Sequence, residues 1–135
     1  MDEENFRSAC PAAGSLDILG DRWSLLIIRD LLMGKRRYAD FQASPEGIST
    51  NILADRLKRL QEFGIVEKRS YQVKPTRYEY NMTRRGADLI PILQELCRWG
   101  EQHLPECWTP PKGLYSLTPE AWWEHSGWDT AEEQN

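Results

Sequence analysis

Side chains that pair with nucleic-acid bases and phosphates are concentrated in residues 47–64. Asn and Arg side chains pair with adenine and guanine edges in a DNA major groove, and Ser, Thr and Lys bind phosphates. At 3.6 residues per turn, the apolar positions fall on one narrow arc: Leu53, Leu57, Leu60 and Gly64. The opposite arc carries Asn51, Ile52, Asp55 and Arg59, flanked by Arg56 and Lys58. The pattern predicts an amphipathic helix with one buried face and one face free to bind a partner.

Both ends of this predicted helix carry suitable boundary residues. Ser49 or Thr50 can accept a hydrogen bond from an unpaired backbone N–H of the first turn, and Gly64 suits the left-handed position after the last turn. A solvated amphipathic helix with no partner would have the same pattern. The neighbouring segments therefore decide between the two interpretations.

The segments around the helix predict a winged helix-turn-helix. Tyr38–Phe41 is predicted to be a short helix, and residues 44–47 form a turn, which completes a helix-turn-helix. Residues 65–71 and 77–82 are predicted to be strands joined by a Pro-containing loop, the wing. Its basic residues suit phosphates or a minor groove: Lys68, Arg69, Lys74 and Arg77. A solvated hairpin with a basic tip is the alternative.

Charge is distributed unevenly along the chain. The net charge is −4, but residues 22–85 hold 14 Lys/Arg against 7 Asp/Glu, a net charge of +7, and the remainder has a net charge of −11. A basic block between acidic ends indicates nucleic-acid binding better than the overall charge does.

The bulk properties predict a single cytoplasmic domain that is not an enzyme. The chain has 135 residues and no apolar run of the roughly 18 residues that span a bilayer. The acidic start is unlike a signal peptide, and the three distant cysteines suit a reducing compartment. His103 and His125 have no nearby nucleophile or glycine-rich loop, and no metal-ligand cluster occurs. We therefore expect no cofactor and no metal.

Further helices complete the predicted fold. One begins at Cys10-Pro11 and ends near Gly20, and the next, residues 22–33, is capped by Asp21, ended by Gly34 and apolar on nearly all sides, as core helices are. A last long helix is expected over residues 84–103, capped by Thr83 and bent at Pro91. Its apolar face is broader than an edge helix needs, which indicates a partner helix.

Composition divides the chain into a flexible N-terminus (1–9), the DNA-binding and dimerisation domain (10–104) and a Trp-rich C-terminal extension (105–135). Residues 118–125 have the Thr-Pro-Glu order of a capped helix. The extension's tryptophans are expected to pack on the domain or on a second subunit: Trp108, Trp122, Trp123 and Trp128. Residues 129–135 are expected to be disordered.

The chain resembles the HxlR-type family of winged helix-turn-helix transcriptional regulators from Cys10 to about His103. The matching segments are Cys10-Pro11, 20–23, 25–31, 37–41, 47–49, 53–57, Leu60, 64–66, 78–80, Thr83, Gly86, 89–93 and 99–100. The resemblance implies a mainly α fold with a small β-hairpin. It also implies a homodimer, held by the N-terminal and C-terminal helices, on a pseudo-palindromic promoter site. The two recognition helices would enter major grooves about 34 Å apart.

Cys10 occupies the position at which several members of this family sense electrophiles or oxidants. Two interpretations stay open. A cysteine at a helix N-terminus lies in the positive end of the dipole, which favours the thiolate, whereas acidic Asp2, Glu3 and Glu4 act against it. The alternative is a small residue packed at a dimer interface.

The predicted function is a DNA-binding transcriptional regulator, with repression as the expected mode. The predicted contacts are Arg37, Ser49, Thr50, Asn51, Asp55, Arg56, Lys58, Arg59, Lys74 and Arg77. Of these, Asn51, Arg56 and Arg59 are expected to contact bases, and Ser49, Thr50, Lys58, Lys74 and Arg77 phosphates. The rival interpretation is a winged-helix module that binds an acidic protein. A dimer cleft lined by Trp23 and Trp99 is a further candidate, for a small aromatic effector.

Overall fold

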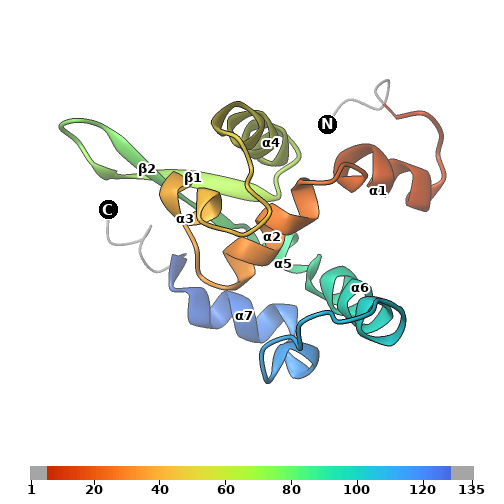
Figure 1. Cartoon of the computed structure of the whole chain (residues 1–135). Coiled ribbons are helices and arrows are strands. Elements are labelled where there is room, and N and C mark those ends of the chain that lie inside the picture. The colour runs from red at the N-terminus through yellow and green to blue at the C-terminus, as the bar shows by residue number, and fades with distance from the viewer. Residues whose placement is uncertain (1–5, 129–135) are drawn as a thin grey trace.

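A computed structural model of the chain describes residues 6–128 (Figure 1). The elements follow in the order α1 (Pro11–Leu19), α2 (Ser24–Leu32), α3 (Tyr38–Gln42), α4 (Thr50–Glu62), β1 (Val66–Gln72), β2 (Arg77–Met82), α5 (Arg84–Ala87), α6 (Ile90–His103), the 3-10 helix η2 (Leu114–Ser116) and α7 (Pro119–Ser126). The fold is mainly helical with one two-stranded hairpin, as the sequence predicts. None of the helices within residues 6–128 is long and apolar enough to cross a membrane.

Helix α2 lies at the centre of the core. Its Ile28 and Leu31 are fully buried, and they belong to one cluster with Leu53 and Leu57 of α4 and Met82 of β2. Burying one such side chain contributes about 1.5–3 kcal/mol relative to leaving it in water. The predicted central helix and the predicted apolar arc of α4 are both confirmed.

The predicted helix boundaries rest on the expected local hydrogen bonds. Asp21 Oδ1 accepts from the backbone N–H groups of Trp23 and Ser24 at 2.7 and 2.8 Å. Ser49 Oγ accepts from Ile52 N at 3.3 Å at the start of α4. Gly64, at φ 73°, adopts the left-handed conformation that ends α4 and turns the chain into β1.

The wing is an antiparallel hairpin in which Val66 lies opposite Met82 and Ser70 lies opposite Tyr78. Its base is fixed to the helical domain, because Tyr80 N donates to Arg36 O at 2.8 Å. Tyr80 and Met82 are buried, whereas Tyr78 extends beyond the core and is exposed. The two predicted strands are confirmed.

The prediction of one bent helix over residues 84–103 is wrong. The chain forms the short helix α5, passes through a turn at Asp88–Leu89, and begins α6 at Ile90. Pro91 lies in the first turn of α6, where a residue without an N–H loses no helical hydrogen bond. Proline therefore starts a new helix here instead of bending a continuous one. Thr83 caps α5, as expected, by accepting from Gly86 N at 3.0 Å.

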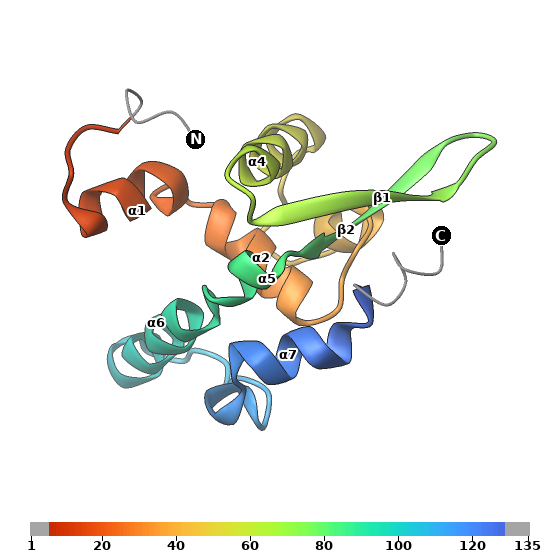
Figure 2. The same ribbon diagram turned by 180° about the vertical axis from the view of Figure 1, so that it is seen from behind.

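The C-terminal extension, described to residue 128, packs on the domain. Gln94 of α6 donates to the carbonyls of Leu114 and Leu117 at 2.8 and 2.7 Å. Trp122 of α7 donates through Nε1 to Leu32 O at 3.0 Å, at the end of α2. Two views related by a half turn show α4 and the wing tip on one side of the molecule and α6 and α7 on the other (Figures 1 and 2).

Gly86→Ala tests how closely α5 approaches the base of the wing. A Cβ at this position would lie 2.2 Å from Ile65 O, a backbone atom that cannot rotate away. We expect the free energy of unfolding in urea to fall by about 1–3 kcal/mol. Gly100→Ala is the control, because its Cβ would meet Leu104 at an ordinary 3.6 Å; equal stability of the two variants would contradict the close approach.

Candidate nucleic-acid interface

The outward face of α4 brings together most of the polar residues that the sequence singles out. Ser49, Thr50, Asn51, Asp55 and Lys58 are all exposed on one helix and its first turn. Leu53, Leu57 and Leu60 bury the opposite face. Because its apolar face is buried, α4 can present hydrogen-bond donors and acceptors to a DNA groove without disturbing the core.

The hydroxyls at the start of α4 already serve the fold. Thr50 Oγ1 accepts from Gln42 Nε2 at 2.7 Å, which joins α3 to α4, and Ser49 Oγ caps the helix. A hydroxyl that accepts one hydrogen bond keeps its own O–H as a donor. Both residues can therefore still donate to a phosphate oxygen.

Arg56 and Arg59 are turned toward the N-terminal segments. Arg56 Nε lies 3.1 Å from Asp21 Oδ1, and its Nη1 pairs with the neighbouring Asp55. Arg59 Nη2 donates to Asp17 O of α1 at 2.9 Å. Their predicted base contacts stay a prediction, but each arginine also fastens α4 to the chain before it.

Asp21 joins the start of α2 to α4. Partial burial raises the pKa of Asp21, but hydrogen bonds from the Ser24 hydroxyl and from the backbone N–H groups of Trp23 and Ser24, together with Arg56, outweigh this effect and bring the pKa down to about 2. The carboxylate is thus held in its charged form by the groups that it connects.

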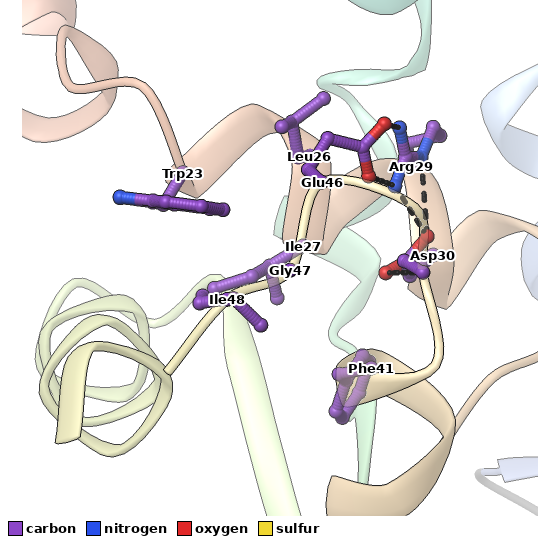
Figure 3. A pocket seen from close by; sticks show the side chains of 10 residues that line it. Trp23, Leu26, Ile27, Arg29, Asp30, Phe41, Glu46, Gly47 and Ile48 are labelled. Atoms are coloured by element: carbon purple, nitrogen blue, oxygen red, sulfur yellow. Dashed lines mark hydrogen bonds and ion pairs between the residues drawn. The ribbon is translucent and has the colours of Figure 1, made fainter. Parts of the chain in front are cut away.

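A polar network fixes the turn between α3 and α4 to the core helix (Figure 3). Arg29 of α2 donates to both carboxylate oxygens of Glu46 at 2.9 and 2.8 Å, and also to Asp30. Asp30 accepts from Ser44 Oγ at 2.8 Å, and Ser44 Oγ accepts from Lys35 Nζ at 2.7 Å. We call Arg29, Asp30, Lys35, Ser44 and Glu46 the turn network.

The turn network is electrostatically matched. The hydrogen bond from Arg29 lowers the pKa of Glu46, and the same bond raises the pKa of Arg29. Asp30 is buried inside an otherwise apolar helix. The adjacent charged residues Arg29 and Asp30 in the middle of such a helix are the sequence signal for this network.

The dimer cleft expected around Trp23 and Trp99 stays a prediction, because the two side chains do not line a common cavity within one chain. Trp23 lines a cavity of only about 10 Å³, and Trp99 is not among the described residues around it. This volume matches roughly one water molecule.

On the wing, Lys74 and Arg77 are exposed at the tip and the start of β2. Arg37 stacks over the ring of Tyr71 with its guanidinium carbon 3.7 Å from the ring centroid. Lys68 lies 4.5 Å from the ring centroid of Tyr78. Such stacking holds long cationic side chains extended along the hairpin.

Two further arginines of the basic block hold the end of the extension. Trp128 is only 1% exposed, and Arg69 and Arg36 lie 4.0 and 5.3 Å from its ring centroid. Arg69 also donates to Trp128 O, and Arg36 to Ser126 O at 2.8 Å. The expectation that Trp128 packs is met, whereas Trp108 is 79% exposed.

The arrangement of a capped outward helix, a preceding short helix and a following hairpin coincides with a family match over residues 18–108, described as HxlR-like helix-turn-helix. The chain belongs to this family. The HTH-type transcriptional regulator YvaP of Bacillus subtilis, itself uncharacterised, is 34% identical over 111 residues, covering 82% of this chain and 98% of that protein. The relatives that the chain matches are named helix-turn-helix transcriptional regulators.

Other relatives extend beyond the shared region or are known in three dimensions. The uncharacterised regulator MT3179 of Mycobacterium tuberculosis is 37% identical over 97 residues, 72% of this chain but 61% of that protein, so this chain spans less than two thirds of its length. The redox regulator HypR in its oxidised form has a TM-score of 0.64 at 31% identity, covering 70% of this chain and 97% of HypR. Its similarity confirms the winged-helix fold.

Asp21→Asn tests the connection between α2 and α4 and its dependence on pH. The pKa of Asp21 lies below the ordinary 3.8, so its ionised form stabilises the fold above about pH 4, and this contribution is lost as the pH falls toward 2. We expect the variant to be about 1 kcal/mol less stable than the parent at pH 7. The difference in the free energy of urea unfolding should shrink between pH 4 and pH 2.

Asp88→Asn is the matched control, because it removes the exposed i,i+4 partner of Arg84 away from α4. Exposed pairs of this kind contribute about 0.3–0.5 kcal/mol. A pH-independent loss in Asp21→Asn, or an equal loss in both variants, would count against the proposed charge effect.

Proposed function

We propose that the protein binds a pseudo-palindromic promoter site as a homodimer, in the cytoplasm, and regulates transcription by repression. The carrying observation is that α4 and the wing tip lie on the same side of the domain (Figures 1 and 2), and that both carry exposed polar or basic side chains. A helix and a hairpin on one side can occupy a major groove and reach the adjacent phosphates together.

The apolar surface of α1 and α6 supports a homodimer. Exposed large apolar side chains lie on these two helices and at the end of α6: Leu16, Ile92, Trp99 and Leu104. Exposed apolar surface of this kind marks an interaction site. A second copy would cover these side chains, and α6 lies on the side of the molecule away from α4 (Figures 1 and 2).

We assign the base contacts chiefly to the exposed Asn51, with Asp55 as an acceptor and with Arg56 and Arg59 at the edge of the interface. Ser49, Thr50, Lys58, Lys74, Arg77 and Arg37 are assigned to phosphates. Arg59 has a second role, because its guanidinium bonds α1. Its replacement by Ala is therefore expected to lower the stability of the fold as well as the affinity for DNA.

Asn51→Ala and Lys58→Ala test the assignment by gel-shift titration on the upstream intergenic DNA of the gene, with random competitor. Loss of a bidentate amide contact should cost about 1–3 kcal/mol at the specific site and relax base preference there. Loss of an ammonium–phosphate contact should weaken specific and random DNA alike and reduce the salt dependence by about one counterion.

Two outcomes would count against this proposal. An equal loss of affinity for specific and random DNA in Asn51→Ala would show that the Asn51 amide contacts only the DNA backbone. No sequence preference at the intergenic site, followed by failure of a genome-wide selection, would favour the module that binds an acidic protein.

We also propose that Cys10 senses oxidants. Its side chain is exposed at the N-cap position of α1, directly before Pro11. The structural neighbour HypR is named a redox regulator and is known in oxidised and reduced forms. Cys10 lies at the start of the helix that carries the exposed Leu16, so a change there would reach the proposed dimer surface.

Diamide treatment of the DNA-binding protein tests this role. Diamide joins two thiols into a disulfide, so we expect operator affinity to fall at least tenfold in the parent and to stay unchanged in Cys10→Ser. Cys107→Ser is the matched control, since Cys107 is also exposed; if its loss also abolishes the response, Cys107 is the second thiol. A parent protein indifferent to diamide would rule out the sensor.

A further inference from the structure

A cavity of about 520 Å³ lies between α2, α6 and the extension, apart from the proposed DNA-binding face. One wall consists of Leu25 and Leu32 of α2 and of Met33, which directly follows this helix. A second wall consists of Leu93, Leu96 and Cys97 of α6. The volume lies within the range of about 300–1,000 Å³ that is typical of sites for small organic ligands.

The extension supplies the third wall, with Trp108, Thr109, Pro110, Pro111 and Leu114. The family match ends at residue 108, so all of this wall except Trp108 lies beyond the shared region. Trp108 is exposed although it is the largest apolar side chain of the wall. An occupant with a ring-shaped apolar body would give this indole a partner.

One end of the cavity is polar and is formed by the turn network. Arg29, Asp30, Lys35 and Ser44 line it together with Pro45. The guanidinium of Arg29 is already paired with two carboxylates. Within residues 6–128, the ammonium of Lys35 donates to the Ser44 hydroxyl and forms no ion pair. Of the two cations that line the cavity, Lys35 is therefore the one that can pair with a ligand carboxylate without breaking an existing ion pair.

We propose that this cavity binds a small organic acid with an apolar, ring-shaped body, whose carboxylate pairs with Lys35. The same ligand contacts Ser44 and Pro45, which directly precede Glu46 and Gly47 in the turn before α4. Binding therefore tightens this turn and changes the presentation of α4. The effect on transcription rests on the proposed function, but ligand binding and the response of the turn do not.

The first experiment measures binding of 1-naphthoate to the full chain by isothermal titration calorimetry, with neutral 1-naphthalenemethanol as the comparison ligand of similar size. We expect one saturable site per chain and at least tenfold tighter binding of the acid. Lys35→Met should abolish this preference, because a hydrogen bond to a charged group is lost. Lys112→Met is the matched control, since Lys112 is an exposed lysine of the extension that does not line the cavity.

The second pair of variants tests the location of the site. Met33→Trp should fill the cavity and abolish binding of both compounds, whereas Val73→Trp at the wing tip should bind normally. Both residues are exposed, but only Met33 lines the cavity. If circular dichroism shows that Met33→Trp is unfolded, Pro111→Trp replaces it from the exposed wall of the extension.

Amide hydrogen exchange tests the response of the turn without DNA. Gly47 N donates to Ser44 O at 3.1 Å, and we expect 1-naphthoate to slow exchange at this amide at least threefold in the parent but not in Lys35→Met.

Each contrary result has a defined meaning. Failure of the parent to bind either compound saturably would overturn the site. Unchanged binding in Met33→Trp or Lys35→Met would also overturn it. Unchanged exchange at Gly47 would overturn the coupling to α4. Ligand binding, the effects of the variants and amide exchange at Gly47 are all measured without DNA. A failure of the proposed DNA binding would therefore not affect the test of the ligand site.

Discussion

The position of the turn before α4 depends on the bidentate pairing of Arg29 with Glu46. The guanidinium comes from α2, which is otherwise packed among apolar side chains, and the carboxylate comes from this turn. Breaking a partly buried pair leaves a charge without its partner, and this makes the geometry of the turn strongly specified. Asp30 and Ser44 extend the same connection by one buried hydrogen bond. The apolar arc of α4 secures the helix to the core, and the pair sets where its first turn begins.

The basic block serves the fold as much as it serves a surface. Arg56 and Arg59 hold the N-terminal segments, while Arg36 and Arg69 enclose Trp128. The guanidinium group of each of these arginines contacts a carboxylate, a backbone carbonyl or an aromatic face. Their planar, multidentate guanidinium groups suit such fixed partners better than a lysine would. The exposed basic side chains on α4 and the wing are Lys58, Lys68, Lys74 and Arg77, so the charge that these elements offer to a partner is smaller than the composition of the basic block indicates.

The C-terminal extension connects parts of the domain that the chain itself separates. Trp122 bonds the end of α2, Gln94 holds the segment around η2, and Trp128 reaches the base of the wing. It thereby contacts the core helix, the proposed dimer helix and the hairpin at once. A segment with three such contacts can transmit a change at one of them to the others, provided that the domain has two arrangements of similar free energy. The cavity of about 520 Å³ is lined by both the extension and the turn network, so its proposed ligand would contact both.

The sequence by itself determined the elements whose causes are local. The helical spacing of Leu53, Leu57 and Leu60, the caps at Asp21, Ser49, Thr83 and Thr118, and the glycine stop at Gly64 predicted most helix boundaries, because each depends on neighbours within a few residues. It also predicted the polar set on α4. Only the tertiary structure decided the attachment of Arg56 and Arg59 to α1 and its following loop, and the pairing of Arg29 with Glu46. These features join residues up to 42 positions apart, and a long flexible cation has several possible partners until the packing of the helices leaves one within reach.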